Sequence, residues 1–183
     1  PNFYRPESDT IYAFLQSWVL RVDGLTVLYD TGAGNAKERP GIPLFGGLET
    51  PFLDRLAAAG FEPRDVDIVI CSHLHIDHVG WNTQLHEGRW VPTFPRARYL
   101  FSRKEYAYAE QRQRELADPV FAENVLPVMD AGLGLLVDPD HVIDETLRLE
   151  STPGHTPGHV AVHIGRGTQD AVVTGDLIHS PLQ

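Results

Sequence analysis

Three histidines and one aspartate lie close together in this sequence, at His73, His75, Asp77 and His78. Imidazole nitrogens and carboxylate oxygens are the ligand types that suit zinc and similar divalent cations. His73 and His75 are separated by one residue, so in an extended segment their side chains project to the same side. Where the chain then turns into a helix, Asp77 and His78 can point to a second position nearby. The segment therefore predicts ligands for two adjacent metal ions.

Two later segments carry side chains of the same kinds. Residues 152–159 have the sequence Thr-Pro-Gly-His-Thr-Pro-Gly-His, in which prolines and glycines fix a tight backbone path that can hold an imidazole rigidly. Together with the first cluster, this favours His155 as a ligand, whereas His159 is read as a supporting or structural residue. Asp176 lies in a Thr-Gly-Asp sequence after a predicted strand. Alone, this short motif is weak evidence for a metal ligand. It becomes informative because it follows the other two motifs in the sequence.

The elements predicted around these residues place them at the ends of strands. Residues 18–30 predict a β-hairpin with a two-residue turn at Asp23-Gly24. Residues 67–71 predict a short buried strand that ends directly before the first histidines. Further strands are expected at 147–151, 160–164 and 171–174, the last two joined by a turn at 165–167.

Helices are expected in two regions, which makes the fold α/β. A long surface loop, 32–49, rich in glycine and proline, precedes the first helix. Its signals are Thr50 as N-cap, Pro51 at the first position and Gly60 just past the end.

The second helical region is 103–132, which could form a lid over the site or pack on the sheets. Ser102 and Glu105 have the spacing of a capping box. Asp118-Pro119 should close one helix and open the next, and Pro127 should kink or break the latter. We expect the whole chain, 1–183, to form a single domain.

Composition excludes some classes of function. The chain has 183 residues, 42% of them hydrophobic, and no apolar run approaches the roughly 18 residues that a transmembrane helix needs. The net charge of −10 argues against nucleic-acid partners, although a metal pair can create a local positive field on an acidic nuclease. Cys71 cannot form an internal disulfide and is expected to be a buried thiol. We expect a cytoplasmic protein without a membrane partner, and the start at Pro1 leaves an upstream signal peptide open.

The three motifs together resemble those of the metallo-β-lactamase superfamily. His-x-His-x-Asp-His, Thr-Pro-Gly-His and Gly-Asp occur here in the order typical of that family, and the Asp-Thr-Gly turn at Asp30 matches it as well. The resemblance runs from about Trp18 to the end. It implies an αββα sandwich whose C-terminal strands and helix are absent from this sequence. Whether the first strands of the sandwich are also absent is left open.

The resemblance also implies roles for individual residues. His73, His75 and His155 would bind a first metal. Asp77 and His78 would bind a second metal, and Asp176 would bridge both. Asp30 would support the site or be purely structural.

The chain departs from the family pattern in one respect. The pattern ends with another histidine beyond the Gly-Asp strand, whereas this sequence stops at Gln183. His179 lies closer to Asp176 than that histidine does, so it is not assigned as a ligand. Either the missing histidine lies in sequence beyond these residues, or the second metal is weakly held.

The function implied is metal-dependent hydrolysis of a small ester or lactone, with a phosphoester as a further option. Two zinc ions, or iron, manganese or cobalt in their place, would hold a hydroxide that attacks the substrate, because metal binding lowers the pKa of water to about 7. Asp77 and Asp176 would be the catalytic residues that orient it, and Asp77 could also shuttle a proton. The sequence around these motifs is similar to that of N-acyl-homoserine lactonases and methyl parathion hydrolase-like enzymes. A homodimer is left open.

Other functions remain open at this point. An iron-dependent redox enzyme, similar to the sulfur dioxygenases of the superfamily, would use the same ligands. The acidic net charge argues against a nuclease. The intact set of ligands for the first metal argues against a relative that binds metal without catalysing a reaction. The aromatic residues Phe45, Trp81, Trp90 and Phe94 could line an apolar pocket, although a core position is favoured for each.

Overall fold

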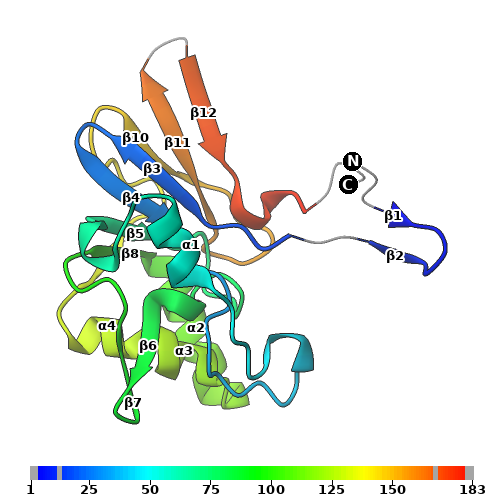
Figure 1. Ribbon diagram of the computed structural model, residues 1–183. Coiled ribbons are helices and arrows are strands. Elements are labelled where there is room, and N and C mark those ends of the chain that lie inside the picture. Colours follow the sequence, from blue (N-terminus) through cyan, green and yellow to red (C-terminus); the bar gives the residue numbers. More distant parts are fainter. Residues whose placement is uncertain (1–3, 12–13, 167–168, 180–183) are drawn as a thin grey trace.

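Two β-sheets lie face to face, and the helices cover the outer face of the larger sheet (Figure 1). The computed structural model describes residues 4–11, 14–166 and 169–179. The larger sheet has the strand order β3-β4-β5-β8-β9, with bounds Trp18–Val22, Leu25–Tyr29, Ile68–Ile70, Arg98–Ser102 and Gly134–Val137. β3 is antiparallel to β4, and the remaining pairs are parallel. The smaller sheet is antiparallel and has the order β10-β11-β12, with bounds Leu147–Ser151, Val160–Arg166 and Gln169–Val173.

The alternation of side chains along β4 separates two hydrophobic cores. Val27 and Tyr29 face the smaller sheet and pack with residues such as Leu149 and Val162. Leu28 points the opposite way, into the core beneath the helices. Both faces of β4 are covered, and the consecutive residues Val27, Leu28 and Tyr29 are all buried. A strand in this position needs apolar side chains on both faces, which explains the unbroken sequence Val-Leu-Tyr.

The predicted hairpin and strands are present. β3 and β4 pair with Val22 opposite Leu25, and Asp23 and Gly24 between them have φ of 49° and 85°, the positive values that a tight hairpin turn requires. The turn expected at 165–167 is only partly described. Gly165 belongs to β11 and pairs with Asp170, so that part of the prediction was wrong, while 167–168 lie outside the described residues.

The first helix, α1, spans Phe52–Ala58. Gly60 has φ of 87° just past its end, as expected, but the N-cap is Pro51 rather than Thr50. The Thr50 hydroxyl instead bonds the side chain of Asn35, 3.0 Å away. The preceding loop is also less exposed than expected, since Lys37 is only 1% exposed.

The second helical region consists of three helices packed on the larger sheet: α2 (Arg103–Leu116), α3 (Pro119–Asn124) and α4 (Leu126–Asp130). Asp118 caps α3 by accepting a hydrogen bond from the backbone N–H of Val120 (3.0 Å), and α4 begins one residue before Pro127, as the sequence predicts. Buried residues such as Phe121 and Val128 join these helices to the core. The region therefore packs on the sheet and does not form a separate lid.

The capping box predicted at the start of α2 is absent. Ser102 is the N-cap residue but makes no capping hydrogen bond with its side chain, and the carboxylate of Glu105 turns away from it. Two small antiparallel hairpins complete the strands: β1 (Tyr4–Arg5) with β2 (Thr10–Ile11), and β6 (Thr83–His86) with β7 (Arg89–Pro92). The first stands apart from the rest of the chain (Figure 1).

The layers observed are helices, larger sheet and smaller sheet, three of the four layers of an αββα sandwich. None of the helices in the described part of the chain covers the outer face of the smaller sheet (Figure 1). None of them is both long and apolar enough to cross a lipid bilayer.

Candidate metal centre

Four loops that follow strands meet at one edge of the two sheets. Asp30 follows β4 and residues 72–78 follow β5, residues 152–159 connect β10 to β11, and Asp176 follows β12. Direct contacts join these loops: the backbone N–H of Val160 donates to the Ser72 carbonyl at 2.9 Å. This arrangement gathers every residue that the sequence analysis singled out as a ligand.

The imidazoles of His73, His75 and His155 converge. One ring nitrogen from each lies within 4.8 Å of the others, and Nδ1 of His75 is 3.0 Å from Nε2 of His155. His73 is completely buried, His75 is half-buried, and the His155 side chain is 28% exposed. The three histidines predicted to share the first metal are thus close enough to hold one ion.

A second group consists of His73, His78 and Asp176, again with one ligand atom from each within 4.8 Å of the others. The two oxygens of the Asp176 carboxylate face different histidines. Oδ1 lies 3.3 Å from Nε2 of His78, whereas Oδ2 lies 3.4 Å from Nε2 of His155. The Asp176 carboxylate therefore lies between His78 and His155.

Asp77 lies at the margin of this second group. Its Oδ2 is 3.7 Å from Nε2 of His78, and its side chain is 21% exposed. It belongs to none of the groups of three potential ligands that the described residues form. The structure therefore places Asp77 beside the cluster, facing the open side.

His179 is a residue that the sequence analysis set aside. Its Nε2 lies 3.1 Å from Oδ2 of Asp176, and it forms a third group of potential ligands with Asp176 and His155. The signal in the sequence was its spacing of three residues from Asp176, across the short helix η4 (Gly175–Leu177). It approaches the side of Asp176 that faces His155, and its own side chain is 53% exposed.

Asp30 organises the cluster through hydrogen bonds. Its Oδ1 accepts from the backbone N–H of Ser72 at 2.7 Å, and its Oδ2 accepts from the Ser72 hydroxyl at 2.8 Å and pairs with Nδ1 of His78 at 2.9 Å. Its φ of 55° is in the left-handed region, which aspartate tolerates better than most residues. A carboxylate that fixes the far nitrogen of a histidine orients the other nitrogen and makes it more basic.

The same network determines which nitrogen of His73 carries its proton. Because the Ser72 hydroxyl donates to Asp30, its oxygen is free to accept from Nδ1–H of His73, 2.9 Å away. This leaves Nε2 as a bare lone pair, and Nε2 is fully buried without a hydrogen-bond partner among the described residues. Buried polar atoms nearly always have partners. A divalent cation at the cluster would supply one, so the residues present fit a metal.

The electrostatics of His73 and His75 match the protonation state that metal ligands require. Burial, and then the neighbouring His78 and His75, lower the pKa of His73 far below its usual value. Burial, followed by His155, lowers the pKa of His75 to about 4. Both imidazoles are therefore neutral at pH 7 and can donate a lone pair.

Nε2 of His78 and Oδ1 of Asp176 form an ion pair, 3.3 Å apart. Burial acts to lower the pKa of His78, but hydrogen bonds to Asp176 and Asp30 outweigh it and raise that pKa to about 10. For Asp176, burial acts to raise the pKa, and the hydrogen bond from His78 outweighs it and holds the pKa well below its usual range. A cation that bound Nε2 of His78 would have to displace its proton.

Two residues in the surrounding loops support Asp176. His159 is completely buried, and its Nε2 accepts a 3.1 Å hydrogen bond from the backbone N–H of Asp176. Gly175 has φ of 54°, and a Cβ there would lie 2.7 Å from Cβ of Ser72 and 2.9 Å from Nε2 of His159.

Cys71 is a buried free thiol, as expected, and burial raises its pKa, so it is no nucleophile at neutral pH.

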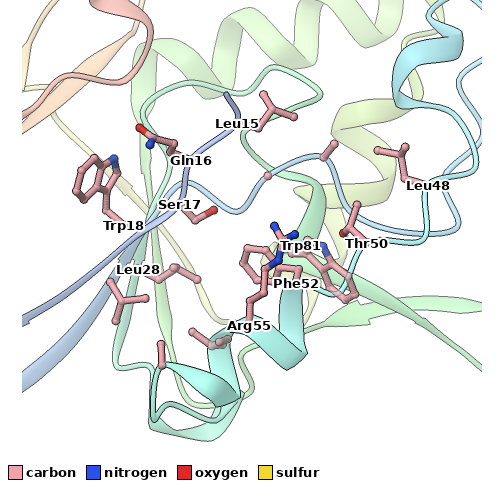
Figure 2. A pocket seen from close by; sticks show the side chains of 15 residues that line it. Leu15, Gln16, Ser17, Trp18, Leu28, Leu48, Thr50, Phe52, Arg55 and Trp81 are labelled. Atoms are coloured by element: carbon pink, nitrogen blue, oxygen red, sulfur yellow. The ribbon is translucent and has the colours of Figure 1, made fainter. Parts of the chain in front are cut away.

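One hollow lies at the cluster, and a second hollow shares a wall with it. The first, of about 680 Å³, is lined by Asp77, His78 and Asp176 and by apolar side chains of β3, β11 and β12. The second, of about 470 Å³, lies between residues 15–19 and α1 (Figure 2). Residues 15, 16 and 18 line both hollows and therefore form a wall common to them.

The four aromatic residues considered for an apolar pocket have different positions. Trp81 lines the second hollow and stacks on Phe52 with ring centres 5.4 Å apart (Figure 2). Phe94 is completely buried in the core, and Trp90 packs against Nζ of Lys37, 3.4 Å from its ring centre. Phe45 lies in the short helix η1 (Pro43–Phe45). Trp81 is thus the member of this set that lines a hollow.

Comparison with known protein families and curated proteins gives the following. Residues 14–183 match the family model described as the metallo-beta-lactamase superfamily. An N-acyl homoserine lactonase from Bacillus sp is 31% identical over 116 residues, which cover 63% of this chain and 40% of that protein. The N-acyl homoserine lactonase AttM from Agrobacterium fabrum is 32% identical over 117 residues, covering 58% of this chain and 39% of that protein. The matches therefore span about two fifths of the curated relatives' length.

Solved structures share the same fold. A probable metal-dependent hydrolase from Staphylococcus aureus has a TM-score of 0.77 at 20% identity, covering 95% of this chain and 62% of that one. AidC, a dizinc quorum-quenching lactonase solved in complex with its product, has a TM-score of 0.65 at 22% identity, covering 88% of this chain and 55% of that one.

Proposed function

Because this chain belongs to the metallo-beta-lactamase superfamily, we propose that it is a metal-dependent hydrolase that opens a small lactone or cleaves a small ester. The observation that carries this proposal is the convergence of the His73, His75 and His155 imidazoles, with the buried Nε2 of His73 lacking any partner within the described protein. Zinc is the proposed resident ion, since neutral imidazoles and a carboxylate are the ligands it commonly takes.

We assign the ligands to two ions. His73, His75 and His155 would hold the first, and His78 with Asp77 would hold the second. Asp176 would be a ligand shared by both, because its two oxygens face His78 on one side and His155 on the other. When bound, zinc supplies Lewis-acid chemistry: it polarises a carbonyl oxygen and lowers the pKa of water to about 7.

The protein side chains place the substrate and handle the proton. In lactone hydrolysis, the oxygen of water forms a bond to the carbonyl carbon, the ring C–O bond breaks, and a proton is delivered to the departing oxygen. We assign that proton transfer to a carboxylate oxygen of Asp77, because Asp77 lines the 680 Å³ hollow at the open side of the cluster. Asp176 keeps the two ligand groups together, and His159 holds the Asp176 backbone in place.

The proposed substrate class rests on the relatives and on the hollow. Curated relatives are N-acyl homoserine lactonases, whose substrates combine a lactone ring with an acyl chain. The hollow beside Asp176 has apolar walls that include Leu20, Ile164 and Val173. Such walls suit an acyl chain, with the lactone carbonyl directed to the polar end.

The proposal is tested by metal analysis of the purified protein together with a panel of acyl homoserine lactones, aryl esters and phosphotriesters. We expect zinc in the protein and the fastest turnover with lactones. Iron accompanied by oxygen consumption would instead identify a redox enzyme. Protein that binds no divalent metal would refute the proposal. His73→Ala should abolish turnover along with metal binding at the first group.

A further inference from the structure

Glu105 is a buried carboxylate that lies outside the ligand cluster, yet it contacts two of the loops that form it. It is the third residue of α2 and is 2% exposed. Its Oε1 accepts a hydrogen bond from the backbone N–H of Leu74 at 3.1 Å, and its Oε2 accepts one from the backbone N–H of Gly158 at 3.0 Å. One side chain thus binds two backbone segments that are distant in sequence.

Both partners of this carboxylate lie between residues of the cluster. Leu74 separates His73 from His75 in the loop after β5, and Gly158 lies three residues after His155 in the loop between β10 and β11. The first loop comes from the larger sheet and the second from the smaller one. The carboxylate therefore ties together the two sheets at the position where their histidines meet.

The loop at Gly158 packs directly on the first turn of α2. A Cβ at Gly158 would lie 2.2 Å from the backbone nitrogen of Glu105 and 2.7 Å from its Cα, so only glycine fits. The positive end of the helix dipole stabilises a carboxylate in this turn. Charge and shape both favour the Glu105 side chain as the acceptor for the two loops.

Besides the contact between the His75 and His155 rings, two further hydrogen bonds lie at the strand ends. The Val160 N–H donates to the Ser72 carbonyl at 2.9 Å, and the Tyr29 hydroxyl donates to the Val160 carbonyl at 3.0 Å. These bonds lie where β5 ends and β11 begins. Glu105 instead holds Leu74, between His73 and His75, and Gly158, three residues after His155. A displacement of either backbone segment changes the separation of the imidazoles.

We propose that Glu105 is a positioning residue that sets the distance between the His75 and His155 imidazoles by tying their loops to α2. The proposal rests on the proposed metal-dependent function. The two ring nitrogens lie 3.0 Å apart, and the carboxylate acts on them only through the Leu74 and Gly158 backbone. Loss of a hydrogen-bond partner of a ligating side chain changes metal affinity about 10- to 100-fold, and we expect an effect of that order when the two backbone bonds of Glu105 are disturbed.

The test uses Glu105→Gln. Glutamine has nearly the same shape, and its carbonyl oxygen still accepts a hydrogen bond, but its NH2 group only donates. One of the two backbone N–H groups therefore loses its acceptor. The matched control is Glu110→Gln on the same helix, where the side chain is 43% exposed and pairs with Arg114. Three quantities are measured: zinc affinity by competition with a chromophoric chelator, the visible spectrum of the cobalt-substituted protein, and the melting temperature of metal-free protein.

We expect Glu105→Gln to bind zinc about 10-fold more weakly or worse, with an altered cobalt spectrum, while Glu110→Gln matches the wild type. Glu105→Gln with wild-type zinc affinity and cobalt spectrum would overturn the proposal, even if the metal-free protein melted at a lower temperature, because the role would then be structural only.

A second variant keeps the proposal falsifiable if Glu105→Gln does not fold. Glu105→Asp retains the charge but is one methylene shorter, so it cannot reach both loops. The same criterion applies: weakened zinc binding supports positioning, and wild-type affinity contradicts it. Wild-type protein that binds no zinc would refute the proposed function itself, and the role of Glu105 would be refuted with it.

Discussion

The backbone N–H of Asp176 donates a 3.1 Å hydrogen bond to Nε2 of His159, a histidine that is completely buried. The other nitrogen of the same ring, Nδ1, lies 2.8 Å from the Thr152 hydroxyl. Since Nε2 accepts this hydrogen bond, Nδ1 carries the ring proton and donates a hydrogen bond to the Thr152 hydroxyl. His159 is therefore fixed at both ends, and Asp176 is fixed through it.

Replacing His159 tests whether this bond holds Asp176 over the cluster. His159→Phe keeps approximately the size of the ring and removes both nitrogens, which leaves the part-buried Asp176 N–H without its acceptor, at a cost of up to about 1–3 kcal/mol. We expect a lower free energy of unfolding and reduced metal content, measured by urea denaturation and elemental analysis. His86→Phe, at an exposed position, is the control. Unaltered metal content in His159→Phe would show that Asp176 does not depend on this histidine.

The bridging role of Asp176 predicts that one substitution disturbs both ions. Asp176→Asn preserves shape but removes the charge shared between the groups around His78 and His155, so the zinc content should fall below that of His155→Ala, which should lose only the first ion. Asp54→Asn on the exposed side of α1 should bind as much zinc as the wild type. If Asp176→Asn retained the full complement of zinc, the carboxylate would not be a bridge.

Gly175 predicts a steric effect that can be separated from a conformational one. Alanine at a left-handed position costs about 1–2 kcal/mol by itself. At Gly175 the added Cβ also meets Ser72 at 2.7 Å, whereas at Gly88, with φ of 76°, it meets nothing within 4 Å. Overpacking of a tight site adds about 1–3 kcal/mol. Chemical denaturation should therefore show Gly175→Ala to be the more destabilised variant, and equal losses in the two variants would contradict the close packing at Gly175.

Lys37 predicts a pH dependence of stability. Burial lowers its pKa to about 7, compared with 10.5 for an ordinary lysine, and its Nζ lies 3.1 Å from the Thr83 hydroxyl. Between these two pH values the unfolded chain binds a proton that the folded chain does not. The free energy of unfolding therefore rises with pH in that window, by at most about 1.4 kcal/mol per pH unit.

The comparison with Lys37→Met isolates this contribution, because other titrating groups such as His78 act equally in both proteins. From pH 7 to pH 9 the stability of the wild type should increase relative to that of Lys37→Met, as measured by denaturant unfolding at each pH. A stability difference that is constant over this range would mean that Lys37 keeps its ordinary pKa in the folded state.

The sequence was informative where the signal is local. The hairpin around Asp23-Gly24, the break before Pro127 and the spacing of His73 and His75 each depend on a few neighbouring residues, and the structure contains all of them as expected. The family resemblance is confirmed by the match over residues 14–183.

Contacts between distant segments could not be predicted in this way. Glu105 has the spacing of a capping box, but its carboxylate instead accepts hydrogen bonds from two backbone N–H groups of other loops. Lys37 lies in a loop that reads as exposed, yet Thr83 and Trp90 from the β6–β7 hairpin enclose it. His179 was set aside because of its spacing, whereas the turn at Gly175 brings it to Asp176.

Crystals grown with zinc, with anomalous diffraction recorded at the zinc absorption edge, test the central claim most directly. The account predicts two anomalous peaks, one among His73, His75 and His155 and the other beside His78, with Asp176 between them. Peaks elsewhere on the protein, or none, while those histidines kept the arrangement described above, would contradict the account.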